Sequence, residues 1–172
     1  MDGNGRQDVT STDVEPTRWL SEAEQSVWRS YIRAMGMIGR ALDRDMRSAH
    51  DLTGDDYGIL AILSEASGRQ LRLGELAREL GVPKTHLTYR ISRLEKAGLV
   101  ERAECPSDGR GVFAHLTESG WDKLVASAPD HVATVRRHLF DLLDDEQVSQ
   151  LGVVMSRLVD GHGPCPTDDC DD

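Results

Sequence analysis

Side chains that can bind phosphate or hydrogen-bond the edge of a base are concentrated in residues 84–93, near the middle of the chain. They are Lys84, Thr85, His86, Thr88, Tyr89, Arg90, Ser92 and Arg93. Lysine and arginine neutralise phosphates, and an arginine can also donate two parallel hydrogen bonds to a guanine in the major groove. The set predicts contact with duplex DNA. Arg90 is the first choice for reading guanine, and the lysine and the short hydroxyls suit backbone phosphates.

The same segment has the periodicity of a helix. Leu87, Ile91 and Leu94 recur at spacings of four and three, so they form one apolar stripe opposite the DNA-contact candidates. Pro83 suits the first turn, where its missing N–H is no loss, and Gly98 suits the left-handed position after the last turn. The alternative for the charged side of this helix is a solvated face, the usual meaning of a charge run.

A second short helix is predicted just upstream, followed by a β-hairpin downstream. Residues 73–80 carry Leu, Leu, Ala and Leu at i, i+3, i+4 and i+7, and Gly81 ends that helix in a tight turn. Two helices joined in this way form a helix-turn-helix, whose second helix enters the major groove. Residues 99–104 and 111–116 are strand candidates on either side of the turn-rich CPSDGR.

A hairpin that follows a helix-turn-helix is called a wing. Its candidate DNA contacts are Ser107, Asp108, Gly109 and Arg110. Arg110 suits a narrow minor groove, where the negative potential is enhanced.

Jointly these residues resemble the MarR-type winged-helix transcriptional regulators. The resemblance covers about residues 71–120. It is carried by Glu75-Leu76-Ala77, Thr85, Thr88, Ile91, Leu94-Glu95, Gly98-Leu99-Val100, Arg102, Asp108, Arg110, Leu116-Thr117 and Gly120. The chain departs from the family pattern at Cys105, where an acidic residue is usual, and at Gly109, where a second arginine is usual.

The resemblance implies a mainly α fold with a small β-hairpin wing (α+β), in which long N- and C-terminal dimerisation helices flank a winged helix-turn-helix DNA-binding lobe. It also implies a homodimer on a pseudo-palindromic operator, commonly a repressor that a small aromatic ligand releases. In such a protein Asp108 holds the wing or a neighbouring arginine in position. No cofactor and no metal are implied.

Long amphipathic segments on both sides of the lobe fit this layout. Ser21 to Glu24 has a capping-box pattern, and apolar residues then recur at three and four, which predicts a helix of roughly 28 residues. Caps at Thr53, Thr117 and Asp144 predict three further helices. Pro129 is predicted to kink the second of these helices, the one capped by Thr117, or to break it near residue 128.

The predicted organisation follows from these elements. It comprises a flexible N-terminal tail (1–17), an N-terminal dimerisation helix (18–52), the winged helix-turn-helix domain (53–117), C-terminal dimerisation helices (118–161) and a flexible acidic C-terminal tail (162–172).

The charge of the chain is unevenly distributed. The formal net charge is −10, which alone argues against a nucleic acid partner. Residues 69–115, however, hold nine Lys and Arg against six Asp and Glu, a net of +3. Because the basic charge lies where the motif lies, we expect local, salt-dependent DNA binding.

Four aromatic residues are candidates for an effector pocket: Trp28, Tyr31, Tyr57 and Trp121. Aromatic side chains at helical spacing are more often part of the core, which is the alternative for all four. For His50 and His131 the sequence likewise leaves three alternatives: a surface position, a core position or a role in ligand binding.

Three cysteines are too few and too scattered for a disulfide framework. Oxidation of Cys105 in the wing would make the protein a redox-responsive regulator, with Arg102 and Arg110 favouring a lower thiol pKa and two nearby glutamates opposing it. Cys165 and Cys170 fit a loose acidic tail better than a metal site or a disulfide. The absence of a long apolar run and of a signal-peptide pattern predicts a cytoplasmic protein without membrane contact.

The sequence offers no catalytic motif: it lacks a phosphate-binding glycine loop, a Gly-x-Ser-x-Gly motif and metal-ligand spacing. We therefore expect no enzymatic activity. The main rival to a DNA-binding regulator is a winged-helix adaptor that binds proteins, because the overall acidity suits a basic partner and fold alone does not decide function.

Overall fold

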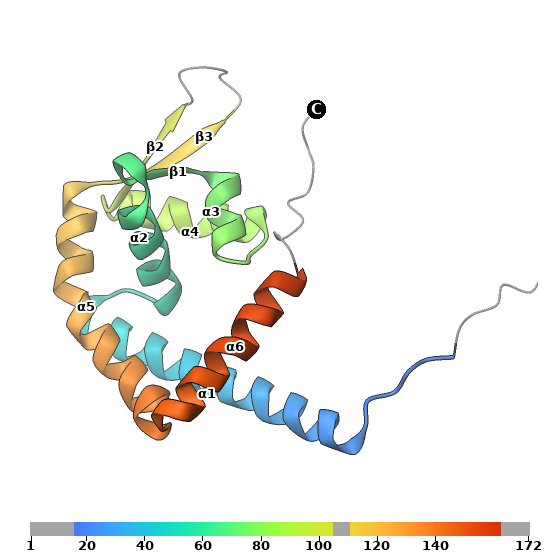
Figure 1. Cartoon of the computed structure of the whole chain (residues 1–172). Coiled ribbons are helices and arrows are strands. Elements are labelled where there is room, and N and C mark those ends of the chain that lie inside the picture. The colour runs from blue at the N-terminus through green and yellow to red at the C-terminus, as the bar shows by residue number, and fades with distance from the viewer. Residues whose placement is uncertain (1–15, 105–110, 163–172) are drawn as a thin grey trace, which may run out of the picture. The chain divides into compact units, whose positions relative to one another are not determined.

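The computed structural model describes residues 16–104 and 111–162. The chain divides into two compact units, Met1–Ala34 and Met35–Asp172 (Figure 1). Helix α1 (Glu22–His50) begins in the first unit and ends in the second. Of the predicted tails (1–17 and 162–172), residues 1–15 and 163–172 lie outside the described residues, and His162 is the last residue of helix α6.

The first unit contains the N-terminal half of α1. The backbone N–H of Ser21 donates to Oε2 of Glu24 at 2.7 Å, and the N–H of Glu24 donates to Oγ of Ser21 at 3.2 Å. The predicted capping box is therefore confirmed, and it satisfies two of the N–H groups that a helix start leaves unpaired.

The second unit holds the remaining elements. After α1 come α2 (Gly54–Glu65), the 3₁₀ turn η1 (Ser67–Arg69), β1 (Gln70–Arg72), α3 (Leu73–Glu79), α4 (Lys84–Lys96), β2 (Val100–Glu104), β3 (Val112–Leu116), α5 (Glu118–His138), η2 (Phe140–Leu142) and α6 (Asp145–His162). The predicted helices and both strands of the hairpin are confirmed. Figure 1 shows α2, α3 and α4 grouped beside the strands, with α5 leading from the sheet to α6.

The sheet has three antiparallel strands in the order β1-β3-β2. Ala114 in the central strand lies opposite Leu71 on one side and Arg102 on the other. β1 was not predicted, because three residues are too few to show the alternation that identifies a strand. Because β1 leads directly into α3 and pairs with β3, it connects the start of α3 to the wing.

The core of the second unit lies between α2, α3, α4, the sheet and the start of α5. Its largest fully buried apolar side chains are Met46, Ile59, Leu60, Leu63, Leu76, Leu87, Ile91, Val100 and Leu116. The apolar stripe predicted on α4 is buried along its whole length, with Leu94 the third member. Its burial holds α4 on the core and turns the opposite side outward.

Helix α5 is continuous from Glu118 to His138 and includes Pro129. The break proposed near residue 128 does not occur, although Figure 1 shows the helix bending near its middle. Thr117 caps it by accepting from the N–H of Gly120 at 3.0 Å. A Cβ on Gly120 would overlap the carbonyl oxygen of Leu99, so only glycine fits where α5 leaves the sheet.

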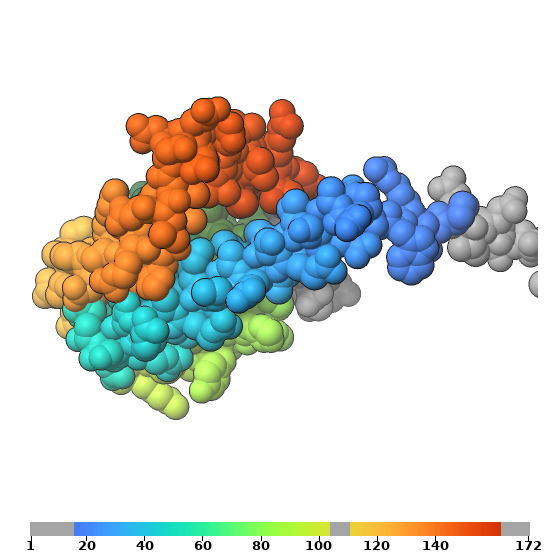
Figure 2. All heavy atoms as spheres, turned by 90° about the horizontal axis from the view of Figure 1, so that it is seen from below, coloured from blue at the N-terminus to red at the C-terminus, as the bar shows by residue number. Residues whose placement is uncertain are grey.

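Helix α6 contains no buried residue. Asp144 and Gln147 form the predicted capping box at its start, with bonds of 3.0 and 2.8 Å. Val153, Val154, Leu158 and Val159 are nonetheless exposed, and in Figure 2 the red end of the chain forms an outer surface of the unit. None of the described helices has the length and apolar character needed to cross a bilayer.

Candidate nucleic-acid interface

The candidate interface is built on α3, the turn after it, and α4. The turn is closed by a hydrogen bond of 3.0 Å from the N–H of Val82 to the carbonyl of Ala77, and Gly81 adopts a left-handed conformation with φ of 63°. Pro83 is the N-cap residue of α4, whereas the sequence predicted it in the first turn, one position further along. Gly98 follows α4 with φ of 72°, as predicted.

The N-terminal half of α4 presents the candidates that are free to bind a ligand. We call Lys84, Thr85, His86 and Tyr89 the outer edge of α4; all four are exposed, Tyr89 by 76%. Their side chains form no ion pair or hydrogen bond within the described part of the chain. Thr88, also exposed, donates its hydroxyl to the carbonyl of Lys84 at 2.9 Å. A cation, a hydroxyl, an imidazole and a phenol thus share one open surface.

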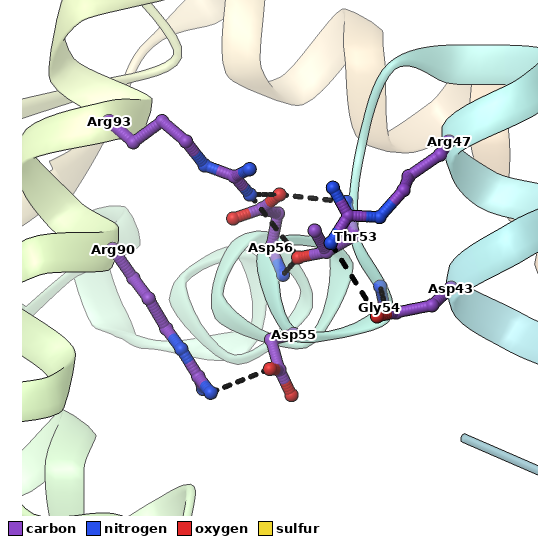
Figure 3. Close-up of polar contacts among 8 residues, drawn as sticks. All are labelled: Asp43, Arg47, Thr53, Gly54, Asp55, Asp56, Arg90 and Arg93. Carbon is purple, nitrogen blue, oxygen red and sulfur yellow. Dashed lines mark hydrogen bonds and ion pairs between the residues drawn. The ribbon is translucent and has the colours of Figure 1, made fainter. Parts of the chain in front are cut away.

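Two arginines on α4 are engaged elsewhere. Nη2 of Arg90 lies 2.6 Å from Oδ2 of Asp55, and Nη2 of Arg93 is bound to Oδ2 of Asp56. Both partners belong to the first turn of α2, and Figure 3 shows the two side chains reaching across to it. Arg90 and Arg93 therefore lie on the side of α4 that faces α2.

Ser92 connects α4 to the wing. Its hydroxyl donates to the carbonyl of Thr88 at 3.0 Å and accepts from Nη2 of Arg102 at 2.7 Å. The same nitrogen of Arg102 donates to the carbonyl of Thr88 at 3.0 Å, and Nε lies 3.7 Å from Oε2 of Glu95. An arginine at the base of the wing thus holds the middle of α4, which gives Arg102 a structural role that the resemblance did not assign.

The wing candidates Ser107, Asp108, Gly109 and Arg110 lie outside the described residues, as does Cys105. The strands that they connect are paired over five positions, from Val100 opposite Leu116 to Glu104 opposite Val112.

The pocket candidates fall in both units. In the first unit the rings of Trp28 and Tyr31 stack with centroids 6.0 Å apart, and both side chains are exposed. This stacked pair is not part of the core of its unit.

In the second unit Tyr57 and Trp121 pack against the hydrophobic core, as the core alternative expected. The ring of Tyr57 stacks on His131 at 3.8 Å, and the guanidinium of Arg69 lies 4.3 Å from the centre of the Trp121 ring. Burial raises the pKa of the Tyr57 hydroxyl and lowers the pKa of the His131 imidazole. His50 binds Oδ2 of Asp130 at 2.7 Å.

Sequence reasoning missed the acidic partners on α2. The sequence predicts a helix cap at Thr53 but gives the acids that follow it, Asp55 and Asp56, no role in holding α4. The unusual feature is two adjacent acids in the first turn of an apolar helix, but the sequence does not show which helix they face.

Comparison with known proteins agrees with this geometry. A family model described as MarR family matches residues 50–111. Among solved structures, the chain is similar to Sco3205, a MarR family transcriptional regulator from Streptomyces coelicolor solved in complex with DNA. The identity is 42% and the TM-score 0.81, over 85% of this chain and 95% of Sco3205.

Two further relatives fit the same pattern. AbsC, a MarR family transcriptional regulator from Streptomyces coelicolor, is 40% identical with a TM-score of 0.76, over 83% of this chain and 95% of AbsC. YkoM, an HTH-type transcriptional regulator from Bacillus subtilis, is 28% identical over 136 residues, which are 79% of this chain and 86% of YkoM. The chain belongs to the MarR family of DNA-binding, winged helix-turn-helix transcriptional regulators.

Proposed function

We propose that the chain is a homodimeric repressor that binds a pseudo-palindromic operator with α4 in the major groove. The observation that carries the proposal is the outer edge of α4, whose side chains are exposed and uncommitted within the described residues. Lys84 binds a phosphate there, while His86 and Tyr89 reach base edges. The hydroxyls of Thr85 and Thr88, both exposed, bind further phosphates of the DNA backbone.

The two arginines take different roles in this proposal. Arg90 is 26% exposed and paired with Asp55, which is itself 57% exposed, so DNA can compete for it. Arg90 thus reads guanine after it leaves Asp55. Arg93 and Ser92 have partners inside the protein and support α4, which revises the contacts expected for them from the sequence.

The wing completes the interface. Ser107, Asp108, Gly109 and Arg110 connect β2 to β3, and by resemblance to the family Arg110 enters the minor groove while Asp108 positions it. Arg102 supports this arrangement because it fixes β2 to α4.

Dimerisation is supported by apolar side chains that each unit leaves unburied. In the first unit Val27, Trp28 and Ile32 are exposed, and in the second unit the 18-residue helix α6 has no fully buried residue and exposes Val153, Val154, Leu158 and Val159. A helix of that length gains most of its stability from burying one face, so α6 requires a partner. We assign residues 18–52 and 118–161 to dimerisation and 53–117 to DNA binding. The half-sites are then about 34 Å apart.

Release by a small aromatic molecule extends the proposal. The exposed stack of Trp28 and Tyr31 offers an aromatic surface in the first unit, and Tyr57 and Trp121 offer partly buried rings in the second. A thermal-shift screen with aromatic acids tests this extension: a ligand that raises the melting temperature supports it, and a screen without any such ligand contradicts it.

DNA binding through the outer edge is tested with a duplex that the wild-type protein selects from a random-sequence library. Anisotropy titrations compare this selected duplex with a scrambled duplex of the same composition. Tyr89→Ala and His86→Ala should each cost about 1–3 kcal/mol on the selected duplex only. Lys84→Ala should weaken both duplexes and lower the salt slope by about 0.9, whereas Lys123→Ala on α5 should not. Unchanged selectivity in Tyr89→Ala and His86→Ala, together with an unchanged salt slope in Lys84→Ala, would contradict the proposal.

A further inference from the structure

Asp56 is buried to a degree that its place in a helix cap does not require. It is 1% exposed, and it is the buried carboxylate among the described residues. Oδ2 accepts the backbone N–H of Thr53 at 2.7 Å and is bound by Arg93, while Oδ1 has no hydrogen-bond partner in the described structure. Burial of a charge at this depth is unfavourable unless a counter-charge is held beside it. Arg93 is that counter-charge.

The contact fixes α4 at two points. Arg93 reaches Asp56 and also Oγ1 of Thr53 at 3.3 Å, and Arg90, one turn earlier, reaches Asp55. Residues three apart lie on the same side of a helix, so both attachments act on one side of α4. In the proposed complex Arg90 leaves Asp55 to bind DNA, whereas Arg93 stays bound to the buried Asp56 and restricts rotation of α4 about its own axis. The direction of the outer edge on DNA therefore depends on the attachment of Arg93.

The first turn of α2 is itself anchored. The N–H of Gly54 donates to Oδ1 of Asp43 on α1 at 2.8 Å, and Asp43 lies 3.6 Å from Arg47. Figure 3 shows this turn held from α1 on one side and from α4 on the other. Because α2 is fixed in this way, its acids can serve as a reference for the orientation of α4.

We infer that Asp56 is a positioning residue for DNA recognition, which acts through Arg93 to set the orientation of the outer edge of α4. The inference rests on the proposed DNA-binding function. Asp56 does not touch DNA, and Arg93 contributes orientation rather than a phosphate contact. The competing account is that Arg93 contacts DNA directly and Asp56 only caps α2.

Three variants separate the two accounts: Asp56→Asn, Arg93→Met and the double variant. Asn can still accept the N–H of Thr53, so the cap is retained while the charge is lost. Ile59→Val is the matched control, because it weakens the core of the same helix without touching the pair. Each protein is titrated against the selected and the scrambled duplex at several salt concentrations, and its thermal unfolding is recorded.

If Asp56 is a positioning residue, Asp56→Asn and Arg93→Met each weaken binding to the selected duplex about tenfold or more. The affinity of each variant for the scrambled duplex then changes by less than about twofold. The salt slope on the scrambled duplex stays constant in Arg93→Met. The double variant regains stability relative to Arg93→Met, because no unpaired charge is left buried. It does not regain selectivity, and Ile59→Val keeps full selectivity.

Four results would overturn the inference. These are wild-type selectivity in Asp56→Asn, a salt slope lower by about 0.9 in Arg93→Met, recovery of selectivity together with stability in the double variant, and an equal loss of selectivity in Ile59→Val. A wild-type protein that does not distinguish the two duplexes would instead refute the proposed function, so the two failures are distinguishable.

Discussion

Nη2 of Arg90 lies 2.6 Å from Oδ2 of Asp55, so the arginine favoured for reading guanine is bound to an acidic side chain of the neighbouring helix. An acid that binds a DNA-contacting arginine competes with DNA for it. The competition is weak, because exposed ion pairs contribute only about 0–1 kcal/mol. If Arg90 contacts DNA as proposed, Asp55 therefore lowers binding to any duplex without abolishing it.

Asp55→Asn should accordingly strengthen binding to the scrambled duplex by about two- to fivefold and steepen its salt slope by about 0.9, since Arg90 becomes free to bind a phosphate. Anisotropy titrations at several salt concentrations measure both quantities. Asp141→Asn is the control, because Asp141 pairs with Arg136 outside α4. Weaker binding in Asp55→Asn would show that Asp55 supports Arg90 rather than competing for it.

Arg102→Met should detach the wing from α4. It removes two charge-assisted hydrogen bonds, to the carbonyl of Thr88 and to Oγ of Ser92, and we expect a loss of about 1–2 kcal/mol in the free energy of unfolding. Arg136→Met breaks an exposed pair and should cost less than about 0.5 kcal/mol. Urea denaturation measures the free energy of unfolding of the two variants. Equal losses would contradict the attachment of the wing to α4 by Arg102.

Gly120→Ala should destabilise the start of α5. The added methyl group meets the backbone of Leu99, which cannot move without displacing the sheet, and overpacking of this kind costs about 1–3 kcal/mol. Gly74→Ala on α3 is the control, since no atom would lie within 4 Å of its new Cβ. Thermal unfolding of both variants tests the contact, and an unchanged melting temperature for Gly120→Ala would refute it.

Leu158→Asp should convert the proposed dimer to a monomer, because it places a charge on the exposed apolar side of α6. Ser149→Asp adds the same charge two and a half turns away, on the opposite side of the helix, and should leave the dimer intact. Sedimentation equilibrium gives the mass of each protein. A dimeric Leu158→Asp protein would mean that α6 is not the interface.

The lowered pKa of His131 predicts acid sensitivity. Below its ordinary pKa of 6.5 the unfolded chain binds a proton that the folded protein does not, so stability falls from about that pH down to the lower folded pKa. His131→Phe keeps the stack on Tyr57 and cannot titrate, so its melting temperature should fall less between pH 7 and pH 5. If the melting temperatures of the variant and the wild type fell equally between pH 7 and pH 5, His131 would not be the source of the acid sensitivity.

The sequence was sufficient for features that depend on local pattern. The stripe of Leu87, Ile91 and Leu94, the caps at Ser21 and Thr53 and the left-handed Gly98 are all set by residues within a few positions of one another. Each is present in the structure. Of the two alternatives predicted at Pro129, the break is absent and the kink agrees with the bend near the middle of α5, which one missing N–H allows (Figure 1).

The features that the sequence did not predict depend on contacts between distant segments. Arg90 and Arg93 look like free DNA contacts in the sequence because their partners lie 35 and 37 positions upstream, on another helix. Arg102 matched a family pattern, but only the packing of β2 against α4 shows what it binds. Arg93 follows Tyr89 by four residues on the same side of α4, so its bond to Asp56, and not its position on the helix, separates it from the outer edge.

The most direct test of the central claim is a titration of the wild-type protein against the selected and the scrambled duplex, with sedimentation to count the chains on each. A homodimeric regulator should place two chains on the selected duplex, bind it about a thousandfold or more tightly than the scrambled one, and lose affinity steeply with salt. Equal affinity for both duplexes, or a single chain per site, would contradict the claim and favour a winged-helix adaptor that binds proteins.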